Sequence, residues 1–101
     1  MPWIKVADAG QIKPGRGNRV TASGRELALF VVGEKIYCLE NSCPHMDGPL
    51  AEGDLEGEIV YCPWHWWPIN VRTGQLTFDE DVCALSIPCK VDSEEVFVDL
   101  P

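Results

Sequence analysis

Hydrophobic and polar residues alternate over short stretches of the chain, and turn-forming residues interrupt these stretches at close intervals. A period of two residues indicates a half-buried β-strand. A helical period is nowhere sustained for more than about two turns, so the pattern predicts an all-β protein with one short helical turn near residues 8–12. We expect strands over residues 3–6, 19–22, 26–32, 35–39, 58–62, 69–71, 85–88 and 95–100.

Turn residues join several of these strands directly. Ser23-Gly24 separates the second strand from the third, and Gly33-Glu34 leads into the fourth, where glycine can adopt the positive φ of a tight hairpin. The longest apolar run, residues 27–32, is far shorter than the roughly 20 residues that span a bilayer. We therefore expect no membrane segment.

Two stretches rich in proline and glycine, at about residues 41–53 and 62–69, lack a strand pattern and each follow a predicted strand. Loops held by a rigid scaffold commonly carry functional residues. With 101 residues, the chain has the size of one domain, residues 1–101, carrying both loops.

Composition places the chain among ordinary globular proteins, with 46% apolar and 24% charged residues. The N-terminus has no basic segment followed by an apolar one, so we expect a reducing, cytoplasmic location. Five cysteines are an odd number, which argues against a closed disulfide framework. We interpret Cys38, Cys83 and Cys89 as small buried apolar residues.

The net charge of −8 is unevenly distributed. Residues 1–33 contain five basic and two acidic residues, and residues 34–101 contain three basic and fourteen acidic ones. This sign disfavours nucleic acid as a partner. The acidic part is either a solvated surface or a face that attracts a basic partner protein.

The strongest chemical signal is the pairing of cysteine with histidine in each loop. Cys43-Pro44-His45 lies in the first loop and Cys62-Pro63-Trp64-His65 in the second, and the sequence has no other histidine. These residue types could hold structural Zn²⁺ or an iron–sulfur cluster. Zinc fingers usually pair like ligands within each half of the site, whereas here each half mixes the two types. The arrangement favours a [2Fe–2S] cluster with Cys43 and Cys62 on one iron and His45 and His65 on the other.

Both motifs resemble those of the Rieske ferredoxins, and the resemblance covers nearly the whole chain. That family typically has C-P-H followed by P-L-x-x-G, and this chain has Pro49-Leu50-Ala51-Glu52-Gly53 after its first motif. Its second motif is typically C-P-W-H-G, later followed by T-G, which is Thr73-Gly74 here. The resemblance implies a Rieske-domain β sandwich or barrel, with a small subdomain in which the two loops bind one cluster.

Departures from the family pattern indicate the subtype. Rieske proteins of cytochrome bc complexes join the loops by a disulfide, but the matching positions here are Gly48 and Trp64. Those proteins also place serine and tyrosine hydroxyls against the cluster or a ligand sulfur, where this chain has Trp67 and Ile69. The resemblance therefore implies a low-potential type without a disulfide.

Trp66 stands where the family commonly has glycine, and it forms an aromatic group with Trp64 and Trp67 around His65. We interpret the group as a hydrophobic lid over the cluster. The alternative is an exposed docking patch, because tryptophan is enriched at the energetic centres of interfaces.

The resemblance implies an electron carrier and not an enzyme. The first hypothesis is a monomeric ferredoxin that passes single electrons from a flavin reductase to a terminal oxygenase. The alternative is the small Rieske subunit of a larger oxidoreductase, such as an NADH-dependent nitrite reductase. A subunit would co-purify in a stable complex, whereas a shuttle would be monomeric.

The subtype predicts a reduction potential at the low end of the range of Rieske clusters, which is about −150 to +300 mV. Fewer hydroxyl donors to sulfur stabilise the added electron less and therefore lower the potential. A spectroscopic redox titration checks this prediction, and a midpoint above roughly +100 mV, well inside the upper part of that range, would contradict it.

Overall fold

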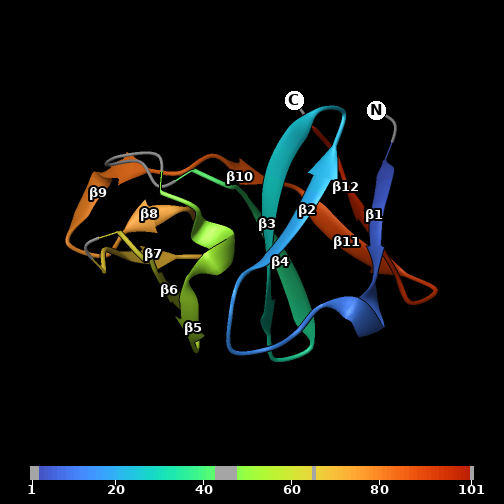
Figure 1. The fold of residues 1–101 in the computed structure, drawn as a ribbon, viewed down its shortest axis with the longest axis horizontal. Helices are drawn as coiled ribbons and strands as arrows, with labels where there is room; N and C mark the ends of the chain where they lie inside the picture. The colour runs from blue at the N-terminus through green and yellow to red at the C-terminus, as the bar shows by residue number, and fades with distance from the viewer. Residues whose placement is uncertain (1–2, 43–47, 65, 101) are drawn as a thin grey trace.

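The computed structural model describes residues 3–42, 48–64 and 66–100. Within them the protein is built from strands and two short 3₁₀ helices, which confirms the predicted all-β class (Figure 1). The elements in chain order are β1 (Ile4–Asp8), η1 (Ala9–Gln11), β2 (Asn18–Ala22), β3 (Arg25–Val32), β4 (Lys35–Glu40), η2 (Leu50–Glu52), β5 (Asp54–Glu56), β6 (Ile59–Tyr61), β7 (Pro68–Asn70), β8 (Gln75–Leu76), β9 (Asp79–Cys83), β10 (Ser86–Ile87), β11 (Cys89–Asp92) and β12 (Glu95–Val98).

The strands form three antiparallel sheets. One sheet has the order β1-β12-β11, the second β10-β4-β3-β2 and the third β5-β6-β7-β8-β9. In Figure 1 the third sheet lies on the left of the molecule, and the first lies on the right. The second sheet stands between them, and both chain ends lie at the top of this view.

Strand β3 is buried on both faces and divides the core in two. Ala28 and Phe30 pack with residues of the third sheet, whereas Leu27 and Leu29 pack with the first. All four have no exposed surface. Because successive side chains of a strand point to opposite faces, a continuous apolar run of this kind fits a strand with a core on each side. The adjacent strand repeats the division at Cys38 and Leu39.

The predicted strands are present, with ends that differ by at most two residues. The helical turn predicted at residues 8–12 is η1. Four strands were not predicted, namely β5, β8, β9 and β11, and neither was the helix η2 inside the first loop. These elements are two to five residues long, too short to establish a period in the sequence.

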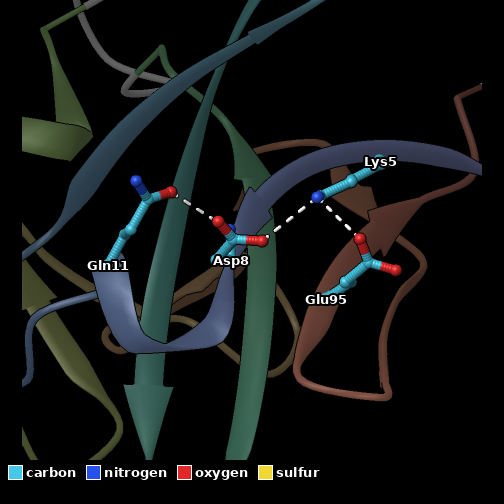
Figure 2. Close-up of polar contacts among 4 residues, drawn as sticks. All are labelled: Lys5, Asp8, Gln11 and Glu95. Carbon is cyan, nitrogen blue, oxygen red and sulfur yellow. Dashed lines mark hydrogen bonds and ion pairs between the residues drawn. The ribbon is translucent and has the colours of Figure 1, made fainter.

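Strands β1 and β12 are joined by an ion-pair network as well as by their ladder (Figure 2). Lys5 Nζ lies 2.6 Å from a carboxylate oxygen of Glu95 and 3.1 Å from one of Asp8. The Asp8 amide in turn donates to Oε1 of Gln11, which fixes the start of η1. The hydrogen bond to Glu95, followed by that to Asp8, raises the pKa of Lys5. The network is exposed to solvent, so its contribution to stability is small.

The cysteines outside the two motifs differ in exposure. Cys38 is buried, Cys89 is half-buried, and Cys83 is exposed. Burial raises the pKa of Cys38 strongly and that of Cys89 to about 11, so both thiols are protonated and unreactive at neutral pH. The interpretation as buried apolar residues is confirmed for Cys38 and wrong for Cys83, which lies on the polar strand β9.

Among residues 3–42, 48–64 and 66–100, no helix is long and apolar enough to cross a membrane.

Candidate metal centre

Cys62 is the one predicted ligand that the structure describes, and it lies in the core that links the second and third sheets. Its side chain is fully buried and packs in the same cluster as Phe30 and Leu39. It follows directly after β6, so the strand sets the position of its backbone. The residue is therefore anchored in the rigid part of the molecule, although it opens a loop.

The two loops meet at Gly48. A Cβ atom built on Gly48 would lie 2.6 Å from Sγ of Cys62 and 3.4 Å from Cβ of Trp64. A real Cβ atom at position 48 would clash with the Cys62 sulfur. Glycine therefore allows the backbone of the first loop to approach this sulfur. Positions 48 and 64 are those that carry the disulfide in Rieske proteins of cytochrome bc complexes. Here the same closeness is obtained by packing glycine against an indole.

The first loop is closed at its base by a side-chain hydrogen bond. Oδ1 of Asn41 accepts from the amide of Ala51 at 2.8 Å, joining residues ten positions apart. Leu50 and Ala51 are buried in the core beside Cys62. Gly53 lies against the carbonyl of Tyr61, which a Cβ at this position would approach to 2.4 Å. These contacts explain the P-L-x-x-G pattern, because leucine anchors the loop and glycine permits close packing on β6.

The second loop is closed by two backbone hydrogen bonds at Cys62. Its amide donates to the carbonyl of Trp67, and its carbonyl accepts from the amide of Trp66, both at 2.9 Å. The loop then enters β7, which pairs with β6. The cysteine is therefore bonded to the far end of this turn at both Trp66 and Trp67.

The three tryptophans after Cys62 do not form a single lid. Trp67 is half-buried against the core, and its ring packs edge-on against Phe78 at 5.5 Å between centroids. Trp64 and Trp66 are 47% and 63% exposed. Trp67 is thus shielded as a hydrophobic lid would require, whereas the exposure of Trp64 and Trp66 contradicts that interpretation for these two residues.

The backbone of Trp66 explains the glycine that is common at its position in the family. Its φ is +59°, in the left-handed region that glycine adopts without strain and that costs other residues about 1 kcal/mol or more. Trp66 lies between the two hydrogen bonds that Cys62 makes with this turn, one from the Trp66 amide and one to the carbonyl of Trp67. The side chain departs from the family pattern, but the backbone keeps it.

Cys43, His45 and His65 lie outside the described residues, as does Asp47, so their assignment stays a prediction. The described residues fit a cluster-binding site in two respects. The Cys62 sulfur is shielded from water, and the backbone of Gly48 approaches it where no side chain intervenes. The positions that match sulfur-directed hydroxyls elsewhere are Trp67 and Ile69, and neither has a hydroxyl group. Ile69 is fully buried beside the cysteine.

A family model for the Rieske [2Fe–2S] domain matches residues 2–88 of the chain. The chain belongs to the Rieske [2Fe–2S] domain family. It therefore carries one [2Fe–2S] cluster, and the alternative of a structural Zn²⁺ site is excluded. The predicted all-β Rieske-domain fold is confirmed for the described residues, which form three antiparallel sheets.

Among known Rieske proteins, the chain is similar to ferredoxins of oxygenase systems. It is 33% identical over 104 residues to the ferredoxin component of the naphthalene 1,2-dioxygenase system of Pseudomonas putida, covering 97% of this chain and 95% of that protein. It is 40% identical over 73 residues to ferredoxin CarAc of Metapseudomonas resinovorans, covering 71% of this chain and 68% of that one.

Solved structures give the same result. The chain superposes with a TM-score of 0.84 and 33% identity on a chain from a complex of oxygenase and ferredoxin in carbazole 1,9a-dioxygenase, covering 98% and 97% of the two chains. It also shares its fold with a structure described as an NADH-dependent nitrite reductase small subunit from Mycobacterium tuberculosis, with a TM-score of 0.87. That pair is 20% identical over 99% and 96% of the two chains, so the likeness concerns the fold alone.

Two structural roles at the site have no counterpart among the sequence predictions. Asn41 closes the first loop, and Gly48 approaches the ligand sulfur. The comparison with disulfide-bearing Rieske proteins points to position 48 only as a missing cysteine. A glycine next to a ligand motif is the available signal, because glycine often marks a close backbone approach.

We predict that Gly48→Ala impairs cluster binding. The added methyl group would force the first loop away from the Cys62 sulfur, at a cost of about 1–3 kcal/mol. Iron content per chain and visible absorbance should both fall. Gly10→Ala is the matched control, because a Cβ there would have no neighbour within 4 Å and should leave both readings unchanged. Full iron content in the Gly48 variant would contradict the prediction.

We predict that Trp66→Gly is more stable than Trp66→Ala by about 1 kcal/mol. Both substitutions remove the indole, and only glycine relieves the left-handed backbone strain. Thermal unfolding of the cluster-loaded variants under anaerobic conditions measures the difference. Equal melting temperatures would show that the backbone at position 66 relaxes without cost.

Proposed function

We propose that Cys43, His45, Cys62 and His65 hold the cluster and that the chain is a one-electron carrier between redox proteins. The observation that carries this proposal is the meeting of the two loops over the buried sulfur of Cys62. Both loops are closed at their base, so each ligand motif starts from a fixed backbone position.

The donor set determines the chemistry that a bound cluster supplies. Thiolates donate negative charge and stabilise ferric iron, while neutral imidazoles donate less, so the histidine-bound iron would be the easier one to reduce. The protein contributes a buried apolar shell, formed by residues such as Leu50 and Ile69, which excludes water from the Cys62 side of the site. These features suit reversible one-electron transfer at a moderate potential.

The partners that we propose are a flavin reductase as the electron donor and the terminal oxygenase of an aromatic-ring dioxygenase system as the acceptor. Support comes from the relatives, which are ferredoxin components of such systems, and from the complex in which a similar ferredoxin accompanies an oxygenase. We further propose that the chain acts in the cytoplasm as a monomer between its encounters with the two partners.

The role of a small subunit in a larger reductase is the second candidate. The similarity to nitrite reductase subunits is limited to the fold, so no observation favours this role. Purification from the native source distinguishes the two, because a subunit would elute within a large complex and a carrier would elute at the size of one chain.

The ligand assignment predicts a changed cluster for one substitution and an unchanged cluster for another. His65→Cys should either abolish the cluster or lower its potential toward the roughly −400 mV of all-cysteine plant-type ferredoxins. Cys83→Ser is the matched control, because this cysteine is exposed and distant in sequence from both motifs. Electron paramagnetic resonance and redox titration of the reduced proteins provide the measurement.

The same samples test electron transfer. The unmodified protein should accept one electron per cluster from NADH through a flavin reductase and pass it to an oxygenase, so that product formation depends on its presence. A colourless protein without iron, or a His65→Cys variant with an unchanged potential and spectrum, would refute the proposed site.

A further inference from the structure

A surface pocket of 380 Å³ lies beside the second loop and is lined by Asp54, Glu56, Tyr61 and Trp66. We refer to it as the Trp66 pocket. Its members come from β5, from β6 and from the turn after Cys62. None of them was assigned a role by the motifs, and Trp66 is the residue at which the chain departs most from its family.

Strand geometry places three of these residues on one face. Asp54 and Glu56 are two positions apart on β5, so their side chains share a face, while Leu55 between them points into the core. Asp54 is paired in register with Tyr61 on β6. The carboxylates and the phenol ring therefore project from the outer side of the sheet, next to the indole of Trp66.

The two carboxylates are exposed, and the backbone of Arg16 is paired with that of Asp54 through an isolated antiparallel bridge. Within the described part of the chain, neither Asp54 nor Glu56 forms an ion pair, whereas nearby Glu58 is paired with Arg72 at 2.9 Å. Trp66 is 63% exposed, which leaves most of a large apolar ring in water. Exposed aromatic side chains of this kind are typical of surfaces that bind other proteins.

The chemistry of the pocket selects a cation. A positively charged group is attracted by the face of an indole or phenol ring and forms charge-assisted hydrogen bonds with carboxylates. The surface is acidic overall, with a net charge of −8, so a basic partner is also attracted from a distance. The side-chain end of a lysine or arginine satisfies both requirements of the site.

We propose that the Trp66 pocket receives a lysine or arginine side chain from the basic surface of a redox partner. The inference rests on the proposed function, because Trp66 is adjacent in sequence to the predicted ligand His65. A cationic side chain held there fixes the partner beside the second ligand loop. The pocket thus positions the partner for electron transfer and takes no part in the redox chemistry.

Cytochrome c, a lysine-rich one-electron acceptor, serves as the probe. The second-order rate constant for its reduction by the reduced cluster-loaded protein is measured at low ionic strength by stopped flow. Trp66→Gly should lower it about threefold, the loss of one cation–π contact. Asp54→Asn combined with Glu56→Gln should lower it about tenfold, through the loss of steering and pairing.

The matched control changes charge equally on the opposite side of the molecule. Asp92→Asn combined with Glu94→Gln alters two exposed acidic residues at the turn between β11 and β12, on the right in Figure 1. This control should change the rate constant less than twofold. Coupling of carboxylates to lysines by a carbodiimide should likewise yield cross-links at Asp54 and Glu56 in preference to Asp92 and Glu94.

Two results would contradict the proposed role of the Trp66 pocket. One is an equal fall in rate for the control pair, which would show that only overall charge matters. The other is a Trp66→Gly variant with an unchanged rate. The visible spectrum and the potential of each variant show which proposal has failed. An intact cluster with no change in rate contradicts the role of the Trp66 pocket alone. A protein that cannot be reduced contradicts the proposed function as an electron carrier.

Discussion

The structure depends on one strand that is buried on both faces. Leu27, Ala28, Leu29 and Phe30 of β3 are all inaccessible to solvent, and alternate residues belong to different cores. A shift of the strand register by one residue would exchange the two sets and mismatch both cores at once. The register of β3 with its neighbours is therefore strongly specified, and it fixes the third sheet relative to the rest of the molecule.

The cluster-binding part of the molecule is held in place by packing against this strand. Cys62 packs in the core on the Phe30 side, together with Leu50 of the first loop and Ile69 after the second. Each loop is thus anchored by a buried side chain near one of its ends. The close approach of Gly48 to the sulfur then brings the loops together without a covalent bond.

The sequence was sufficient for the parts in which a local pattern repeats. Strands β2, β3 and β4 are five to eight residues long and are joined by glycine turns, so their hairpins could be predicted. Strands β5, β8 and β9 could not, because β5 and β8 have only three and two residues and β9 begins with three acidic ones. They exist because they extend a sheet whose other strands are already fixed, which is a tertiary effect that no local pattern records.

At the site, the ligand motifs were evident from residue type and spacing, whereas the role of Gly48 required the structure. The exposure of Trp66 likewise could not be predicted from the sequence. Its identity suggested a buried lid, but the side chain is 63% exposed and stands on a left-handed backbone in the turn that Cys62 closes. A side chain at a position shaped for glycine is directed by the backbone and not by its own hydrophobicity.

Charge alone cannot explain how a partner would find the cluster-binding side of this protein. Acidic residues also lie at the turn between β11 and β12, in the first sheet, on the other side of the molecule from β5 and β6. Long-range attraction would bring a basic partner to either region, because steering depends on the summed field. At Asp54 and Glu56, carboxylates without an ion pair among the described residues lie beside an exposed indole. The indole of Trp66 therefore distinguishes this acidic region from the one between β11 and β12, which net charge alone cannot do. A tryptophan at a position where the family commonly has glycine is explained if it orients the bound partner.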